Sequence, residues 1–461
     1  MKKHPQSQRL GTEAILPLLF RLSIPGMVSM SVQALYNVVD SLFVARVSES
    51  GLTALAIAFP VHIFIIALST GTGIGTSSLI SRMLGREDPK AAFLVAQHVI
   101  AAGLIYGILS GFAGMFLAGP LVSFFTEDPQ VLVYGTQYIR VLLLGSVFLY
   151  VSIIASDIMR GQGNTFVPML ALMLGAITNI ILDPFMIFGI GFFPRLEVLG
   201  AALATVISKA ISCLFILVIL YGGDNEIKPR MERFSFDYRI LGEVYKIGLP
   251  NMVMQVMTSL MISILNGIVG AYSEVAIAVN GVYFRLQSFA IMPVFGLTQG
   301  YIPIIGYNYG AGNAERMKRT VIYALITGLC ITSIGSLLFR FLPAQLMSLF
   351  NPGDEMMQIG IHTLQTISIG LFVVGPSIIG ATTFQAIGKG LPALALSFMR
   401  QMILLVPLAY IFGEMWGLYA VWYAFPVSEF FSFSVMILWL GKRLKKVFKE
   451  MESSSIQSKK E

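Results

Sequence analysis

Residues 24 to 45 read IPGMVSMSVQALYNVVDSLFVA, an apolar run long enough to cross a lipid bilayer as a single helix. Comparable runs recur through all 461 residues, and the chain is 56% hydrophobic and only 12% charged. A soluble protein of this size carries about a quarter charged residues. The sequence therefore predicts an all-α polytopic membrane protein.

The apolar runs predict 12 transmembrane helices. Their expected ranges are 14–46, 52–80, 91–118, 130–158, 166–190, 198–221, 241–270, 276–305, 318–342, 357–384, 391–412 and 415–440. The most polar internal segment is GGDNEIKPRMERFSFDYR, residues 222–239. We expect a six-helix bundle over 1–221, a cytoplasmic linker over 222–239, a second six-helix bundle over 240–441, and a basic tail over 442–461.

Lysine and arginine gather in alternate connections and in the tail, which places both termini in the cytoplasm and the protein in the cell inner (plasma) membrane. The net charge of +7 comes from these connections, so we expect no nucleic-acid partner. Two isolated cysteines in apolar runs indicate packing rather than a disulfide or a metal site. No catalytic motif is recognisable, so an enzyme is not expected.

The chain contains an internal repeat with one constant offset, the offset that relates Pro25 to Pro250. The same offset relates Gly71 and Gly75 to Gly296 and Gly300, Gly85 to Gly310, Phe125 to Phe350, and Gly163 to Gly388. Six spans repeated in one orientation predict two pseudo-symmetric bundles related by an axis along the membrane normal. This arrangement is typical of transporters that hold the substrate between the halves.

Two acids lie deep inside spans, Asp40 and Asp183. A carboxylate at such depth costs roughly 2.5 to 3.5 kcal/mol on insertion, so it must be neutral, paired or in contact with water. The repeat offset relates them to Leu265 and Leu408, which assigns both acids to the N-terminal bundle.

Helix rise places Asp40, Asp183 and Thr205 at a common depth, roughly 10 Å inside the outer boundary. Asn179 lies one turn from Asp183 on the same helix face. Carboxylate, amide and hydroxyl groups are ligands for a proton or Na⁺, and we expect no other metal. The alternative is that each aspartate only bonds a helix backbone or a neighbouring side chain.

Gln33, Tyr36 and Asn37 share a helix face with Asp40. This polar stripe either lines the substrate cavity or forms a hydrogen-bonded seam with another helix. Pro25 is either a fixed kink or a bend that responds to protonation of Asp40.

Methionine and aromatic side chains in the second bundle suit an adaptable substrate cavity, although ordinary packing is the alternative. The candidates are Met257, Tyr283, Gln287 and Met292. Arg285 and Glu429 lie inside spans and are expected to form a structural ion pair. Asp157 and Arg160, three residues apart near a helix end, are expected to form a surface pair.

The chain resembles the multidrug and toxic compound extrusion (MATE) family over nearly its whole length. The resemblance rests on the 12 spans, the polar linker, MRGQGN at 159–164, and the segments NVVDSLFVAR and NIILDPFMIFGIG. It implies the branch whose cation site lies in the N-terminal bundle, with Asp40, Asn179, Asp183 and Thr205 as the site and Pro25 as the helix bend.

The resemblance implies a multidrug antiporter, coupled to H⁺ or Na⁺, that exports amphipathic or cationic compounds by alternating access. A lipid-linked oligosaccharide or polysaccharide flippase is the alternative, because such flippases share the architecture. We expect a monomer in the lipid bilayer with small-molecule substrates and no cofactor other than the coupling ion.

Overall fold

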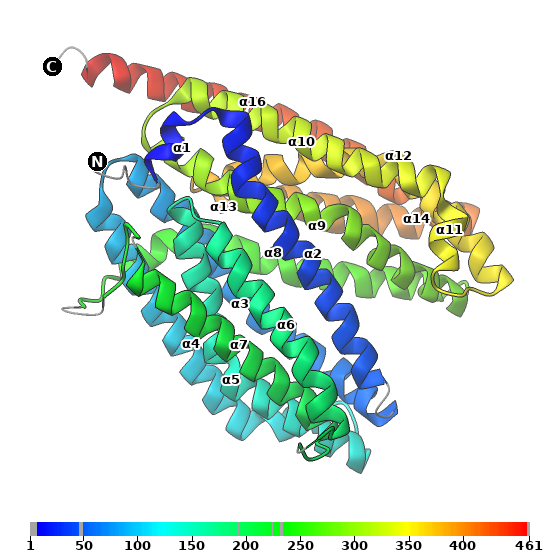
Figure 1. Ribbon diagram of the computed structural model, residues 1–461. Helices are drawn as coiled ribbons and strands as arrows, with labels where there is room; N and C mark the ends of the chain where they lie inside the picture. The colour runs from blue at the N-terminus through cyan, green and yellow to red at the C-terminus, as the bar shows by residue number, and fades with distance from the viewer. Residues whose placement is uncertain (1–6, 46–48, 192, 224, 231–233, 459–461) are drawn as a thin grey trace. The chain divides into compact units, whose positions relative to one another are not determined.

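The computed structural model describes residues 7–45, 49–191, 193–223, 225–230 and 234–458, and these contain helices without any strand. Twelve helical segments are long and apolar enough to span a membrane, which confirms the predicted fold class. The first ten are α2 (Ile15–Ala45), α3 (Glu49–Gly85), α4 (Pro89–Ser123), α5 (Pro129–Gly161), α6 (Phe166–Phe188), α7 (Glu197–Gly222), α8 (Tyr238–Gly270), α9 (Glu274–Gly310), α10 (Ala314–Phe341) and α12 (Asp354–Ala386) (Figure 1).

The last two spans are interrupted. The eleventh consists of α13 (Gly390–Phe398), the π-helical turn η1 (Met399–Leu405) and α14 (Val406–Trp416). The twelfth consists of α15 (Leu418–Val421) and α16 (Ala424–Ser458). Two short helices, α1 (Gln8–Thr12) and α11 (Pro343–Ser348), lie outside the spans.

The repeat is visible in the helix ends. Asp88 caps α4 by accepting a hydrogen bond from the Ala91 amide, and Asn313, its equivalent by the repeat offset, caps α10 in the same way. Gly163 and Gly388 follow α5 and α12, and both have φ +85°. Glycine is favoured there because other residues are strained in the left-handed region. Equivalent positions therefore begin and end equivalent helices.

Contacts divide the chain into two compact units. Unit 1 comprises Met1–Arg9 and Val28–Met252, and unit 2 comprises Leu10–Met27 and Val253–Glu461. The first part of α2 thus belongs to unit 2 and its remainder to unit 1, while the first part of α8 belongs to unit 1 and its remainder to unit 2. The repeat offset relates the two positions at which these helices pass from one unit to the other. This grouping follows contacts, whereas the bundles expected above follow chain order.

We call this division of α2 and α8 between the two units the exchange of these helices. Small residues make it possible. In unit 1, a Cβ on Gly71 of α3 would lie 2.7 Å from the Gly248 carbonyl of α8. In unit 2, a Cβ on Gly300 of α9 would lie 2.6 Å from the Leu22 backbone of α2. Real Cβ atoms do not approach so closely, so these glycines let the backbones of the exchanged segments pack together.

The polar linker is attached to unit 1. Gln162, which follows α5, accepts a hydrogen bond from the Ile227 amide at 2.8 Å and donates to the Ile227 carbonyl at 3.4 Å. Gln97 of α4 donates to the Arg230 carbonyl, and Nε2 of His98 accepts from the Asp237 amide at 2.8 Å. The segment predicted as a boundary is therefore held by side chains at several points.

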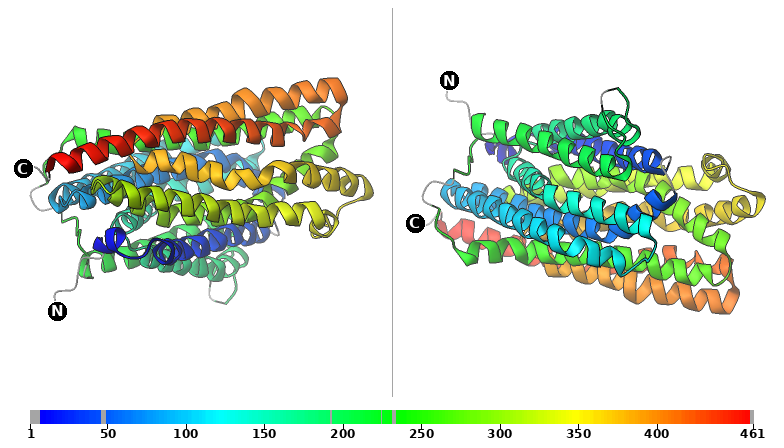
Figure 2. Two further views of the ribbon diagram at one scale, coloured as in Figure 1. Left: turned by 90° about the horizontal axis from the view of Figure 1, so that it is seen from above. Right: turned by 90° about the horizontal axis from the view of Figure 1, so that it is seen from below.

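The predicted basic tail is helical through Ser458. It continues the twelfth span without interruption, because α16 runs from Ala424 to Ser458. The left view of Figure 2 shows α16 as one long helix, coloured orange to red, that leads to the C-terminus.

Candidate cation-binding site

Helices α6 and α7 bring three of the four predicted site residues together. The amide Nδ2 of Asn179 donates to Asp183 Oδ1 at 3.3 Å and to Thr205 Oγ1 at 3.5 Å. All three side chains are buried. The i, i+4 spacing of Asn179 and Asp183 places both on the face of α6 that packs against α7.

Asn179 is the link between the two helices, and one of its atoms needs a further partner. Among the described residues, Oδ1 of Asn179 is buried without a hydrogen bond. A buried oxygen left unsatisfied costs roughly 1 to 3 kcal/mol, so such atoms in native proteins bind water, an ion or another side chain. The side-chain NH₂ of Asn179 donates to Asp183 and Thr205, and its oxygen is left as an available acceptor.

Helix α2 carries Asp40, the fourth predicted member of this site, together with the predicted cavity residues Gln33, Tyr36 and Asn37. The backbone at Tyr36, Asn37 and Asp40 is helical, while their side chains lie outside the described residues. This part of α2 belongs to unit 1, as do α6 and α7. Gln33, one or two turns earlier, is partly buried.

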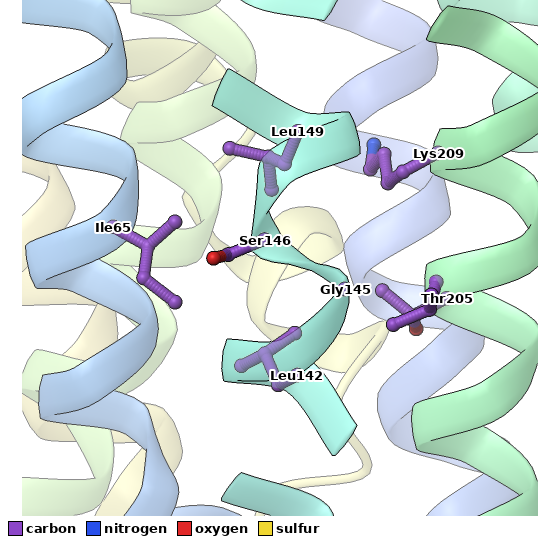
Figure 3. Close-up of a pocket in the computed structure, with 8 residues that line it drawn as sticks. Ile65, Leu142, Gly145, Ser146, Leu149, Thr205 and Lys209 are labelled. Atoms are coloured by element: carbon purple, nitrogen blue, oxygen red, sulfur yellow. The ribbon is translucent and has the colours of Figure 1, made fainter. Parts of the chain in front are cut away.

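Thr205 also borders a small pocket between α3, α5 and α7 (Figure 3). The figure shows Thr205 and Lys209 extending from α7 toward α5, with Ile65 of α3 on the other side. The lining is mostly apolar and comprises Ile65, Leu142, Gly145, Ser146, Leu149, Thr205, Val206 and Lys209. Lys209, one turn from Thr205, is the cation nearest in sequence to the site.

Pro25 and Pro184 both lie inside continuous helices, α2 and α6. Each removes one backbone donor, which leaves a carbonyl one turn earlier without its helical hydrogen bond. Pro184 directly follows Asp183, so the freed carbonyl belongs to Ile180, next to Asn179. Pro25 lies just before the point where α2 passes from unit 2 to unit 1.

The candidate cavity residues of the second bundle differ in burial. Tyr283 lies in the hydrophobic core of unit 2, with its ring 5.3 Å from that of Phe425, and Met257 is also buried. Gln287 and Met292 are partly buried. Their assignment to a substrate cavity remains a prediction.

The expected pairing of Arg285 with Glu429 is wrong. Glu429 of α16 pairs with Arg400 of η1 at 2.6 Å, while Arg285 is exposed. Reasoning from the sequence missed Arg400, although a lone arginine in the apolar run ALSFMRQMILL was a visible signal. The extra backbone atoms in each π-helical turn alter which face a residue occupies, so spacing along the chain could not identify the partner.

The expected surface pair of Asp157 and Arg160 forms, but it is not on the surface. The two groups are 2.9 Å apart with side chains only 9% and 12% exposed. Asp157 is buried because it packs against Gly73 of α3, where a Cβ would overlap the carboxylate. Sequence position near a helix end did not reveal this neighbour.

Comparison with known proteins decides the family. The MatE family model matches residues 25–185 and again residues 250–411, two copies whose first residues are related by the repeat offset. The chain belongs to the MatE family. It is a multi-pass membrane transporter, and the resemblance inferred from the sequence is confirmed.

Relatives of this MATE chain include the multidrug export protein MepA of Staphylococcus haemolyticus (strain JCSC1435), 24% identical over 90% of this chain and 91% of its own length. A structure of a multidrug resistance MATE transporter in the outward-facing conformation is 30% identical with TM-score 0.91, covering 97% of this chain and all of that one. A transporter of the MOP superfamily from Pyrococcus furiosus is 29% identical with TM-score 0.90, covering 97% and 99%.

Proposed function

We propose that this MATE transporter is a multidrug antiporter that couples export of amphipathic, often cationic, compounds to entry of H⁺ or Na⁺. The coupling cation binds at Asp183, Asn179 and Thr205 in unit 1. The observation that carries the proposal is the amide of Asn179, which bridges Asp183 and Thr205 while its own oxygen lacks a partner among the described residues.

The chemistry follows from burial. A carboxylate enclosed by α6 and α7 is destabilised when charged, and either a proton or a hard cation with oxygen ligands removes that cost. Binding therefore favours whichever arrangement of the protein encloses the site. Release favours the arrangement that opens it to water, and substrate binds best to that second arrangement. A ligand shifts such an equilibrium only by its difference in affinity for the two states.

Asp40 is the proposed second carboxylate. Its depth in the sequence matches that of Asp183, and its helix segment belongs to the same unit as α6 and α7. Pro25 is the proposed bend through which occupancy of the site alters α2. At about 100 mV each inward positive charge supplies about 2.3 kcal/mol, which is sufficient to drive a modest export gradient.

The names of relatives favour a drug exporter over the lipid-linked oligosaccharide flippase. A flippase needs several cationic side chains in its cavity to meet phosphates, and the candidates for this role are Arg285 and Lys209, since Arg400 is paired with Glu429. Relatives named as multidrug export proteins support the exporter. We propose a monomer in the plasma membrane with both termini in the cytoplasm, as the distribution of lysine and arginine indicates.

The test is dye efflux from proteoliposomes under an imposed pH or Na⁺ gradient, comparing the wild type with Asp183→Asn and Asn179→Ala. We expect Asp183→Asn to abolish efflux driven by one of the two gradients and to retain gradient-independent exchange of dye for dye. Asn179→Ala should require a steeper gradient for the same rate, because the ligands on α6 and α7 lose their link. Wild-type coupled efflux by Asp183→Asn would refute the proposal.

A further inference from the structure

The C-terminal part of α16 carries five cationic side chains within eight residues, Lys442, Arg443, Lys445, Lys446 and Lys449. Three apolar side chains in the same segment, Leu444, Val447 and Met451, are buried. Burial of these three fixes the rotation of the helix. It therefore also fixes the direction in which the cations extend.

The rotation places the cations on one face. At about 100° per residue, Lys442, Lys445, Lys446 and Lys449 fall within an arc of about 100°. Leu444, Val447 and Met451 lie on the opposite side of the helix, and all four lysines are exposed. We call these four lysines the lysine stripe. Among the described residues the lysine stripe has one carboxylate partner, Glu450, 4.0 Å from Lys446.

The same face is apolar and exposed inside the membrane-spanning part of α16. Val427, Phe431 and Leu438 lie at the helix angles of the lysine stripe, and their side chains are 45%, 53% and 66% exposed. Large apolar side chains exposed on a membrane-spanning helix contact lipid acyl chains. The lipids that cover Phe431 and Leu438 therefore place their headgroups beside Lys442 to Lys449, which lie about one to three turns beyond Leu438.

We propose that the lysine stripe is a binding surface for anionic phospholipid headgroups. A basic cluster directly after a transmembrane helix attracts anionic lipids, and long lysine side chains can reach back to the headgroup layer. Here acyl-chain contacts and headgroup contacts lie on one continuous face, so a single lipid layer satisfies both. A solvated face without lipid preference would need no such alignment.

Trp439 is an internal reporter for this surface. It is 38% exposed and lies one turn before Lys442, whereas Trp422 is fully buried and Trp416 lies at the end of α14 in the preceding span. In full-length protein carrying Trp416→Phe, reconstituted in nanodiscs, we would compare quenching of Trp439 by brominated phosphatidylglycerol and brominated phosphatidylcholine at equal mole fractions. We expect about fivefold enrichment of phosphatidylglycerol near Trp439, the factor that corresponds to one favourable lysine contact.

Replacing the four lysines by glutamine should abolish the enrichment. A control with four other exposed cations replaced by glutamine, Arg86, Lys90, Lys246 and Lys318, should retain it. Raising the salt concentration should weaken the enrichment in the wild type without any substitution. Inorganic phosphate at matched ionic strength should not compete more than chloride does.

Equal quenching by the two lipids in the wild type would overturn the proposal, as would unchanged preference in the four-lysine variant. An equal loss in the control variant would attribute the preference to total charge rather than to this face. Specific competition by inorganic phosphate would identify a phosphate site instead of a lipid surface.

Discussion

At the residue scale, buried charges in this transporter are controlled by their immediate neighbours. Asp157 is accommodated inside unit 1 because Gly73 opposite has no side chain, and Arg160 neutralises it. Glu429 is similarly matched by Arg400. Removing one partner of a buried pair leaves an uncompensated charge, which costs several times more than the pair itself contributes.

Gly73→Ala is therefore expected to destabilise the protein, because the added Cβ overlaps the Asp157 carboxylate and forces α3 and α5 apart. Overpacking of this kind costs about 1 to 3 kcal/mol. The control is Gly267→Ala in α8, where a Cβ meets nothing within 4 Å. Alanine loses less backbone entropy on folding than glycine, so this change should stabilise the protein by about 0.5 to 1 kcal/mol. Thermal unfolding in detergent measures both, and an unchanged melting temperature for Gly73→Ala would contradict the packing described above.

At the element scale, the exchanged helices α2 and α8 connect the two units. The crossing points at Met27–Val28 and Met252–Val253 each follow a proline inside the helix, Pro25 and Pro250. A missing backbone hydrogen bond makes a helix easier to bend at that point. Both halves of the repeat thus place their weakest helical turn next to the crossing.

Pro25→Ala and Pro250→Ala should each restore one helical hydrogen bond, worth about 1 kcal/mol, and so favour the straight helix about fivefold. We expect slower dye efflux for both variants, with the initial rate in proteoliposomes as the measurement. Pro60→Ala in α3 is the matched control, since that proline lies inside a helix but not at a crossing. A similar loss in the control would assign the effect to general rigidity.

The linker is a second feature at the element scale, and its attachment at His98 depends on the tautomer of the ring. Nδ1 of His98 lies 2.7 Å from the Leu94 carbonyl, which can only accept, while Nε2 accepts from the Asp237 amide. Only the neutral ring with its proton on Nδ1 makes both bonds. The rings of Phe234 and Phe236 flank the imidazole, with ring centroids 5.0 and 5.9 Å from its own.

Loss of the imidazole should therefore release the linker, because the Asp237 amide loses its acceptor. Hydrogen exchange of the peptide around Asp237 should show protection in the wild type and low protection in His98→Phe. Equal protection in the two proteins would contradict the attachment at His98.

At the scale of the whole molecule, the two repeats share their helix caps and left-handed glycines but differ in their charged residues. Equivalent caps and left-handed glycines begin and end equivalent helices, yet Asp183 corresponds to Leu408. Unit 2 carries the Arg400–Glu429 pair, in which the protein supplies its own cation. We therefore expect coupling to reside in unit 1 alone.

The double variant Arg400→Gln with Glu429→Gln should transport with the same ion dependence as the wild type, because it removes both charges together. Asp183→Asn should lose ion dependence altogether. The measurement is efflux rate against H⁺ or Na⁺ concentration, with a melting curve to establish folding. A shifted ion concentration for half-maximal efflux in the double variant would place part of the coupling in unit 2.

The sequence by itself determined the 12 spans, the internal repeat and the proximity of Asn179, Asp183 and Thr205. Hydropathy, glycine and proline positions, and helix rise are local or periodic properties, which any chain in a membrane must respect. Only the tertiary structure decided the exchange of α2 and α8, the pairing of Arg400 with Glu429, the burial of Asp157 and the attachment of the linker. These depend on which helix surfaces meet, and one helix carries too little information about its neighbours to predict that.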